Sequence, residues 1–434
     1  MENQLPNNWV EGYLYDLVQP IKTGVNKYDG EKPYYSTGSV KENKLNIEAG
    51  YSFGEKPSRA NREVNKGDVL QARMLNTDKA LLINEEIKNG LYSTGFMQFR
   101  PYGNTILSKY IYFYLKSEVF HTQKDILASG TTQVAINDAN AKKILFPLPP
   151  LKEQQRIVAK LNSLFAHIEE VKTRLEQVPQ LLNHFRQAVL SKSVSGELTF
   201  GYKKLNNLSN WEKISLGSIT KLVTSGSRGW AKYYSEEGAI FVRAQNINED
   251  YLNLNDVAYV KLEGNTEGIR TRIFENDLLI TITGANVTKT AVVDFPISEA
   301  YVSQHVSLVR LENPEFSKFV YLHLISQSDG RKQLNDFAYG QGKPQLNLSN
   351  IKNVEILLPS INEQMEIVRR VEVLFSKADE IQQRYEALYK SVEVLPRAIL
   401  QKAYLGELVE QLPTDGDARE LLKEIEALKK LKVK

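Results

Sequence analysis

The short motifs that could act on a nucleic-acid base or a phosphate are each incomplete. An adenine methyltransferase needs an Asn/Asp-Pro-Pro-aromatic loop to grip a flipped base, and the nearest stretch, Asn313-Pro314-Glu315-Phe316, lacks the second proline. Gly342-Lys343 resembles the end of a phosphate loop, but Phe337 stands where the first glycine is needed and Pro344 where Ser or Thr is needed. We interpret both stretches as ordinary turns.

Nuclease and metal sites are not supported either. Glu42-Asn43-Lys44 has the Glu-x-Lys spacing of nucleases, but no Pro-Asp pair precedes it. The chain has five His and no Cys, and no two His residues have paired ligand spacing. We therefore expect no catalytic residue, no metal ligand and no cofactor in this chain.

Composition sets broad limits on the class of protein. A chain of 434 residues is expected to form several domains. Lys and Arg number 55 against 52 Asp and Glu, so net charge alone does not indicate nucleic-acid binding. The N-terminus lacks the features of a signal peptide, and no apolar run is long enough to span a membrane. We expect a soluble, cytoplasmic protein.

The chain is organised by a repeat of about 50 residues that contains two long helices. Pro149-Pro150-Leu151-Lys152-Glu153-Gln154 returns as Pro359-Ser360-Ile361-Asn362-Glu363-Gln364, 210 residues later, and the match runs without a gap to Gly196-Glu197-Leu198 and Gly406-Glu407-Leu408. In each copy, apolar residues alternate three and four apart, the heptad pattern of a coiled coil. The two series are Ile157, Leu161, Leu164, Ile168, Val171, Leu175, Val178, Leu182, Phe185, Val189 and Ile367, Val371, Leu374, Ala378, Ile381, Tyr385, Leu388, Val392, Leu395, Ile399.

Each apolar seam needs a partner, and the simplest partner is the other helix. Antiparallel packing is favoured because the second globular segment can then begin where the first helix ends. Pro179 predicts a kink or break near residues 175–177, and Pro396 predicts a similar defect in the second helix. Gly196 and Gly406 are expected to stop the helices.

The segments around the helices are read as mixed α and β structure. A helix is expected at Ser108–Phe120, with Ser108 as its N-cap, and strands at Ala239–Val242 and Val306–Leu311. Asn7-Asn8-Trp9 is echoed by Ser209-Asn210-Trp211, although the interiors of the two segments show little likeness. The predicted division is a first globular domain at 1–147, a spacer helix at 148–198, a second globular domain at 199–357, a second spacer helix at 358–410 and a basic tail helix at 411–434.

The fold class is therefore α+β: two mixed α/β globular domains joined by two long antiparallel coiled-coil helices, with a pseudo-two-fold internal repeat. The repeated Leu-Pro-x-x-x-Glu-Gln and Gly-Glu-Leu stretches, together with Gly67-Asp68-Val69-Leu70, Asn276-Asp277-Leu278-Leu279-Ile280 and Ser303-Gln304-His305, resemble the specificity subunits of type I restriction–modification systems. The resemblance covers essentially the whole chain.

That resemblance implies a non-catalytic subunit with two target-recognition domains, each reading one half of a bipartite, gapped site in double-stranded DNA. The conserved helices would set the gap and dock two methyltransferase subunits, which supply the S-adenosylmethionine chemistry. Motor–nuclease restriction subunits would join to cut unmodified DNA.

Candidates for DNA reading are the basic, polar and aromatic residues of loops, since Arg and Lys suit guanine and phosphate whereas Asn and Gln suit adenine. Trp9 and Trp211 are assigned to packing. In the first domain the candidates are Lys32, Tyr34, Tyr35, Arg59, Arg62, Arg73, Thr131, Thr132 and Gln133. In the second they are Ser227, Arg228, Trp230, Lys232, Arg243, Gln245, Asn246, Asn286, Lys289, Gln341 and Lys343.

Two other classes of protein remain open at this point. A two-headed scaffold that binds protein partners on a coiled-coil spacer would account for the near-neutral charge, and steep salt dependence of DNA binding would argue against it. A self-sufficient modifying enzyme would have to bind S-adenosylmethionine by itself.

Overall fold

The computed structural model describes residues 5–41, 44–46, 49–130, 134–262, 268–340, 342 and 344–432. The chain divides into two compact units, one made of residues 1–175 and 387–434 and the other of residues 176–386. Each unit has its own apolar cores, and each is described by itself.

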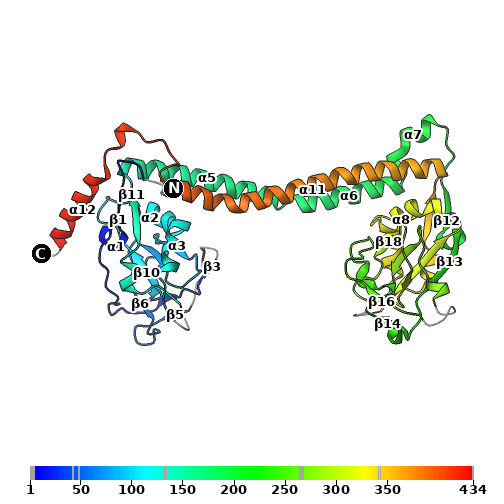
Figure 1. Ribbon diagram of the computed structural model, residues 1–434, viewed down its shortest axis with the longest axis horizontal. Coiled ribbons are helices and arrows are strands. Elements are labelled where there is room, and N and C mark those ends of the chain that lie inside the picture. The colour runs from blue at the N-terminus through cyan, green and yellow to red at the C-terminus, as the bar shows by residue number, and fades with distance from the viewer. Residues whose placement is uncertain are drawn as a thin grey trace. The chain divides into compact units, whose positions relative to one another are not determined.

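Unit 1 contains a three-stranded sheet, a four-stranded sheet, two strand pairs and a set of helices (Figure 1). Its elements are β1 (Val10–Tyr13), α1 (Leu14–Leu17), β2 (Lys32–Tyr35), β3 (Val40–Lys41), β4 (Lys44–Leu45), β5 (Gly50–Tyr51), β6 (Ala60–Arg62), β7 (Val69–Ala72), β8 (Ala80–Leu82), β9 (Leu91–Ser93), β10 (Phe96–Phe99), α2 (Ser108–Leu115), α3 (Glu118–Ile126), α4 (Asp138–Ala141), β11 (Leu145–Leu148), α5 (Leu151–Leu175) and α12 (Ala418–Lys432). One sheet has the order β10-β7-β8 and the other β5-β2-β9-β6, in which β2 and β9 are parallel.

Unit 2 repeats this plan. Its elements are α6 (Val178–Val194), α7 (Phe200–Leu205), β12 (Glu212–Ser215), β13 (Thr220–Ser225), β14 (Tyr234–Ser235), β15 (Ala239–Val242), β16 (Ala258–Val260), β17 (Leu278–Thr281), β18 (Thr290–Val292), β19 (Ala300–Val302), β20 (Val306–Leu311), α8 (Ser317–Ile325), α9 (Gly330–Phe337), α10 (Leu348–Lys352) and β21 (Glu355–Leu358). The sheets are β13-β20-β17-β18 and β14-β16-β15-β19, and here β15 and β19 are the parallel pair.

The likeness between the interiors is therefore structural even where the sequences differ. In each unit an antiparallel strand pair joins the beginning of the globular part to its end, β1 with β11 and β12 with β21. In these pairs Val10 faces Leu148 and Glu212 faces Leu358. The internal repeat predicted from the two helix copies thus extends through both globular parts.

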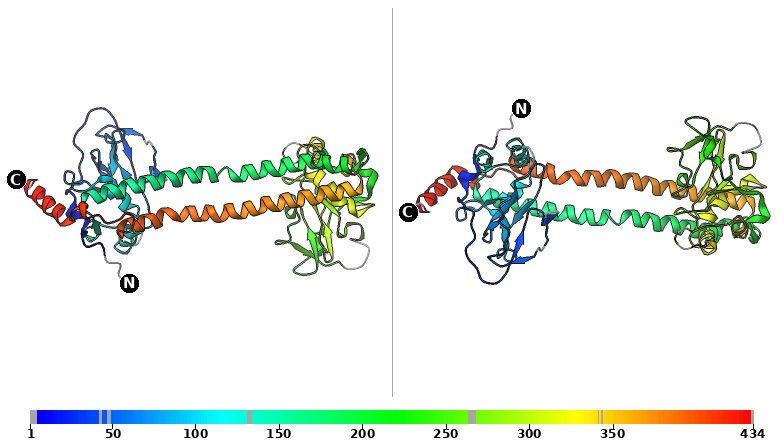
Figure 2. Two further views of the ribbon diagram at one scale, coloured as in Figure 1. Left: turned by 90° about the horizontal axis from the view of Figure 1, so that it is seen from above. Right: turned by 90° about the horizontal axis from the view of Figure 1, so that it is seen from below.

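Helix α11 (Ile361–Tyr404) contributes one half to each unit. In unit 1, Ile157 and Leu161 of α5 share a core with Leu400 and Tyr404, whereas Ile168 lies farther along α5 in a hollow with Glu393. Advancing along α5 therefore means going back along α11, so the two are antiparallel, and both views in Figure 2 show α5 beside this part of α11.

The same direction holds within unit 2. Arg186 of α6 forms an ion pair with Asp379, at 2.6 Å, while Val189 shares a core with Val371 and Ile367. The α+β class and the antiparallel packing of the long helices are confirmed.

The two prolines behave differently from one another. A break between α5 and α6 was predicted at residues 175–177 and is confirmed, with Pro179 in the first turn of α6. The predicted defect at Pro396 is wrong, because α11 runs through it without interruption. Val392 and Leu400, one turn to either side, are both buried, and we attribute the continuity to their packing, which offsets the missing backbone donor.

The heptad seam is buried at its ends and half-exposed between them. Ile157 and Leu161 are fully buried, but Leu388 is 49% exposed and Ile381 is 51% exposed. Two helices cover only part of each other, and the ends gain additional cover from the globular parts.

The bounds of individual strands and helices can be compared with those predicted. Strands β15 and β20 have the predicted bounds. The helix expected at Ser108–Phe120 is instead two helices, because Ser117 caps α3 through a hydrogen bond from the backbone N–H of Phe120. Leu107, not Ser108, is the N-cap of α2. Gly196 and Gly406 follow α6 and α11 with φ values of 81° and 76°, as expected of residues that stop helices.

Candidate functional site

The repeated glutamate at the start of each long helix joins three distant segments of its unit. In unit 1, Glu153 is fully buried and accepts hydrogen bonds from Trp9 Nε1 at 2.9 Å and Gln411 Nε2 at 2.7 Å. Burial raises the pKa of Glu153, while the hydrogen bonds from Trp9 and Gln411 oppose that shift. This clamp explains why Trp9 and Glu153 both belong to the repeat.

Unit 2 has a similar clamp, built on the equivalent Glu363 and Trp211. Glu363 is fully buried and accepts hydrogen bonds from Trp211 Nε1 and Thr199 Oγ1, both at 2.9 Å. Thr199 directly follows the Gly-Glu-Leu stretch after α6, whereas Gln411 lies three residues beyond the one after α11, so the Trp–Glu hydrogen bond is repeated and the third partner differs. The prediction that Trp9 and Trp211 serve packing agrees with these contacts.

A second pair of equivalent contacts fixes the strands that carry the loops. Arg100 holds Asp68 through two hydrogen bonds, at 2.6 and 2.7 Å, and Arg310 holds Asp277 in the same way, at 2.7 and 2.6 Å. Each carboxylate also accepts a backbone N–H three residues earlier. Burial raises the pKa of Asp277, and the contact with Arg310 opposes that shift.

The first-domain candidates for DNA reading are dispersed, and several are committed to internal contacts. Arg62 is buried and donates to Gln98 Oε1 at 3.3 Å; burial, and then the nearby Arg73, lower the pKa of its guanidinium. Arg73 donates to the carbonyl of Ile136 and pairs with Asp138. Both arginines therefore hold the loops of unit 1 together.

Three of the remaining first-domain candidates lie on β2. Tyr34 and Tyr35 are buried, with Tyr34 against the ring of Tyr51. Lys32 lies 4.6 Å from the ring centroid of Tyr28. Arg59 is exposed on the loop before β6.

Five candidates lie outside the described residues. They are Thr131, Thr132, Gln133, Gln341 and Lys343.

In unit 2, by contrast, six predicted candidates gather around two adjacent hollows. The first, of about 250 Å³, is lined by Ser227, Arg228, Trp230 and Lys232. The second, of about 370 Å³, shares Ser227 and Trp230 and adds Arg243 and Gln245. Candidates from two separate loops thus converge on one surface.

The indole of Trp230 supports that surface from beneath. It is 6% exposed and stacks on Phe241, with ring centroids 5.0 Å apart and planes 11° apart. Tyr301 packs against it at 5.5 Å. Trp230 therefore anchors the loop that presents its exposed neighbour Arg228, and its direct contact with DNA stays a prediction.

The three other described candidates of this domain are internally bonded. Asn246 is buried and donates to the carbonyls of Asn253 and Asp256. Asn286 donates to the carbonyl of Ala244 at 3.2 Å. Lys289 pairs with Asp250 at 3.3 Å. Their predicted contacts with DNA are untested.

The structure also adds residues that were absent from the candidate list. Arg270 lines the first hollow, and Gln304 and His305 line the second. The Ser303-Gln304-His305 stretch carried part of the family resemblance, so a signal for this loop was present in the sequence. No sequence pattern singled out Arg270.

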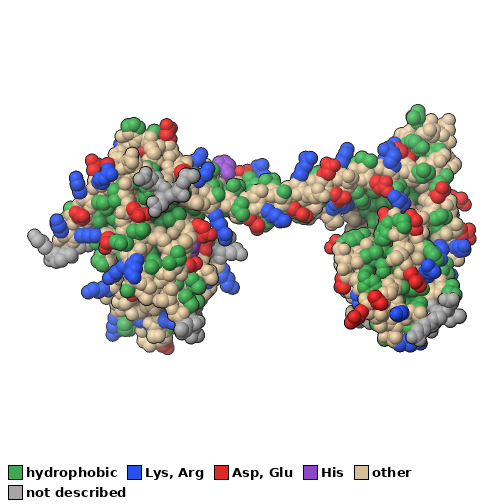
Figure 3. Space-filling view, viewed as in Figure 1, with side chains coloured by type: hydrophobic (Ala, Val, Ile, Leu, Met, Phe, Trp, Pro, Cys, Tyr) green, Lys and Arg blue, Asp and Glu red, His purple; other side chains and the backbone are tan. Residues whose placement is uncertain are grey.

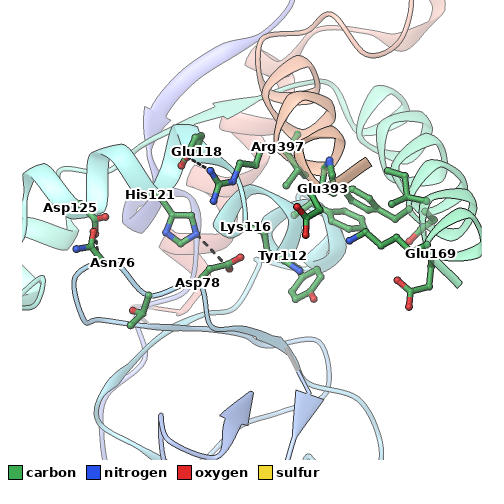
Figure 4. A pocket seen from close by; sticks show the side chains of 18 residues that line it. Asn76, Asp78, Tyr112, Lys116, Glu118, His121, Asp125, Glu169, Glu393 and Arg397 are labelled. Atoms are coloured by element: carbon green, nitrogen blue, oxygen red, sulfur yellow. Dashed lines mark hydrogen bonds and ion pairs between the residues drawn. The ribbon is translucent and has the colours of Figure 1, made fainter. Parts of the chain in front are cut away.

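A larger hollow in unit 1 has a different character. It has a volume of about 820 Å³ and is lined by residues of α2, α3, α5 and α11. Figure 4 shows the side chains that line it. Five acidic side chains line it, namely Asp78, Glu118, Asp125, Glu169 and Glu393, against Lys116, Lys172, Arg397 and His121. Such a lining does not favour a DNA backbone, and none of the predicted DNA-reading residues belongs to it.

Asn313 accepts a hydrogen bond from the backbone N–H of Glu315 in a short 3₁₀ turn, consistent with an ordinary turn. Among the described residues, no cluster of three or more His, Cys, Asp or Glu side chains could hold a metal ion. None of the described helices combines the length and apolar composition that crossing a bilayer requires.

Comparison with known families decides the class of the protein. The family described as type I restriction modification DNA specificity domain matches residues 6–180 and 208–389. The chain belongs to this family. It is a DNA specificity subunit with two target-recognition domains, which confirms the resemblance and the expectation of a subunit that is not an enzyme.

Individual relatives agree with this assignment. The specificity subunit of the type I restriction enzyme EcoBI of Escherichia coli is 32% identical over 323 residues, covering 69% of this chain and 67% of the relative. That of StySPI of Salmonella potsdam is 30% identical over 312 residues, covering 70% and 66%. The matches thus span about two thirds of these longer relatives.

Solved structures share the fold. The HsdS subunit from Thermoanaerobacter tengcongensis matches with a TM-score of 0.65 at 20% identity, covering 93% of this chain and 98% of that one. A chain from a structure of type I restriction–modification complex assembly and conformational transition matches with a TM-score of 0.68 at 19% identity, covering 93% and 100%.

Proposed function

We propose that each target-recognition domain of this specificity subunit reads one half of a bipartite, gapped site in double-stranded DNA. The observation that carries the proposal is the repeated frame with dissimilar loops. The Trp–Glu hydrogen bond is the same in the clamps at Glu153 and Glu363, whereas the residues at the loop surfaces differ between the units. A frame used twice with different loops suits two unequal half-sites.

The partners follow from the family and from the helices. Two methyltransferase subunits would dock on the long helices, and motor–nuclease restriction subunits would join that complex, all in the cytoplasm where the DNA lies. Apolar residues off the seam support docking, since Leu181 is 62% exposed and Val394 is 61% exposed. Figure 3 shows hydrophobic side chains along this region between charges of both signs.

The segment boundaries are part of the proposal. Residues 1–147 and 199–357 would be the recognition domains, 148–198 and 358–410 the spacers, and 411–434 a tail. The tail contains α12, whose Leu421 and Ile425 are buried in the core of unit 1. This segment would stabilise the first recognition domain and would not touch DNA.

Methylation mapping tests the function. Cells with the methyltransferase partner, with and without this subunit, are compared for methylated adenines across the genome. A gapped, asymmetric motif that depends on this subunit is expected. Methylation without a motif, or a motif independent of the subunit, would contradict the proposal.

A second version of that experiment tests whether the long helices set the length of the gap. Removing seven residues from α5 and the matching seven from α11 keeps the heptad register of both helices. We expect a shorter unread gap with both half-sites unchanged, or loss of methylation. An unchanged gap would show that the helices do not set it.

The salt dependence of DNA affinity distinguishes a DNA-reading subunit from a scaffold that binds only proteins. In Figure 3, Lys and Arg are interspersed with Asp and Glu over the face shown, in keeping with the formal net charge of +3. Binding to DNA must then come from local clusters of cations, and each phosphate contact steepens the fall of affinity with salt. A complex with no salt-dependent DNA affinity would favour the scaffold.

A further inference from the structure

Equivalent turns end the parallel strands of the two units. After β2, Ser39 Oγ accepts a hydrogen bond from the backbone N–H of Ser36 at 2.7 Å. After β15, Asn246 Oδ1 accepts one from the backbone N–H of Arg243 at 2.9 Å. In both cases the acceptor lies three residues beyond the donor, so Ser36 and Arg243 occupy the same position of the same turn.

The partner strands end in a second pair of equivalent turns. After β9, Ser93 Oγ accepts from the backbone N–H of Gly95 at 3.1 Å, and after β19, Ser303 Oγ accepts from that of His305 at 3.4 Å. The carbonyl of Gly95 accepts a hydrogen bond from the N–H of Arg73, just after β7. The carbonyl of His305 accepts one from the N–H of Ile282, just after β17. Gly95 and His305 are therefore equivalent as well.

The two turns of each unit lie side by side, because parallel strands end at the same edge of a sheet. In unit 1 a Cβ atom added to Gly95 would lie 3.2 Å from Thr37 Cγ2, so the turns meet through small side chains. In unit 2, Arg243 and His305 both line the hollow of about 370 Å³. The backbone is conserved between the units, and the side chains at its edge are not.

We infer that this pair of turns is the specificity-determining edge of each recognition domain, and that Arg243 reads a guanine for the second one. The inference rests on the proposed function and names residues for it. An arginine donates two hydrogen bonds to the O6 and N7 atoms of guanine in the major groove. Ser36 and Gly95 at the same positions give the first domain a different reading edge.

The surroundings of Arg243 suit such a role. Its backbone is fixed by Asn246, which is itself bonded to two carbonyls. Its Nε is buried, and no described residue accepts a hydrogen bond from it. A buried donor without an acceptor is costly, and a base that orders the guanidinium would remove part of that cost.

The neighbouring cations have a separate task. Arg228 and Lys232 are exposed and line the other hollow, beside Arg270. Exposed cations on loops suit phosphates, which carry no sequence information directly. Arg228 therefore provides the matched control for Arg243.

The experiment uses the complex with its methyltransferase partner and compares R243S with R228S. R243S installs the residue that the first domain has at this position and keeps the backbone N–H that Asn246 accepts. We expect R243S to relax one position of the second half-site by about tenfold or more, with the first half-site and the gap unchanged. We expect R228S to weaken binding to all sequences evenly and to reduce the salt slope by about one.

R243K separates recognition from charge, since lysine retains the cation but not the two-pronged geometry. R243K should relax the same position as R243S while the thermal unfolding of both variants matches that of the parent chain. An unchanged motif in R243S, or an even loss of affinity like that of R228S, would overturn the inference. Failure of the proposed function looks different, because the parent complex itself would then show no gapped motif.

Discussion

The two recognition domains of one chain use the same internal contacts to present different surfaces. Asp68 with Arg100 and Asp277 with Arg310 match bond for bond. In the turns that follow β2 and β15, however, unit 1 has Ser36 where unit 2 has Arg243. The difference shows that buried charged and polar contacts preserve the frame, while the residues at its edge are free to change the reading.

The long helices offer a second contrast. Pro179 lies where the first helix is interrupted, and Pro396 lies inside a helix without a break. A proline in the first helical turn costs little, because that N–H has no partner within the helix. One in the interior is retained only where tertiary packing holds the segment.

The largest effect is expected from breaking the Asp–Arg pairs. D277A leaves Arg310 without its carboxylate and removes the acceptor for the N–H of Phe274, so we expect a loss of about 3 kcal/mol in the free energy of unfolding of unit 2. D68A should destabilise unit 1 by a similar amount. Urea unfolding followed by hydrogen exchange in each unit measures both.

D277N and D68N are the matched controls, because asparagine keeps one acceptor oxygen and the shape. They should lose less than the alanine variants. If only one of the two units were sensitive, the equivalence of the pairs would be refuted.

A smaller loss is expected at the glutamate clamps. E153A and E363A leave the indole N–H of Trp9 or Trp211 without an acceptor, which costs about 1.5–3 kcal/mol. The loss should be larger for E153A, since Trp9 is 4% exposed and Trp211 is only half-buried. Tryptophan fluorescence during denaturation measures the effect, and E153Q and E363Q should recover much of it.

The smallest change concerns the prolines and has the opposite sign. P396A restores a backbone N–H donor inside the helix, where alanine is favoured over proline by up to about 3 kcal/mol. Replacing proline also gives the unfolded chain more conformational freedom, which opposes part of this gain. We therefore expect P396A to raise the free energy of unfolding of unit 1 by about 1 kcal/mol. P179A should not stabilise unit 2. Thermal unfolding compares the two, and equal shifts would contradict the distinction between these sites.

Much of the fold was predictable because periodic or repeated stretches of the sequence specify it. The heptads of α5, α6 and α11 and the copied Glu153 and Glu363 gave the helices, their pairing and the family. Half-exposure of Leu388 and Ile381 was not predictable, because a heptad pattern does not specify how many helices cover it.

The sequence predicted which types of residue form the candidate site, but it predicted only some of their positions. Arg228, Arg243 and Gln245 do converge on one surface, but Arg62 and Asn246 carry the same functional groups and are buried. Arg270 reaches the surface from a loop about 40 residues away in sequence from Arg228. Loop sequences fix the chemistry available but do not fix which side chains meet.

The sequence by itself determined the duplicated frame, the long helices and the family, because these depend on spacing within the chain and on likeness between its two halves. Only the tertiary structure decided which arginines hold the interior together and which line a hollow, and that Ser36 and Arg243 occupy one turn. Burial and hydrogen-bond partners arise from contacts between residues far apart in sequence, and no local pattern encodes them.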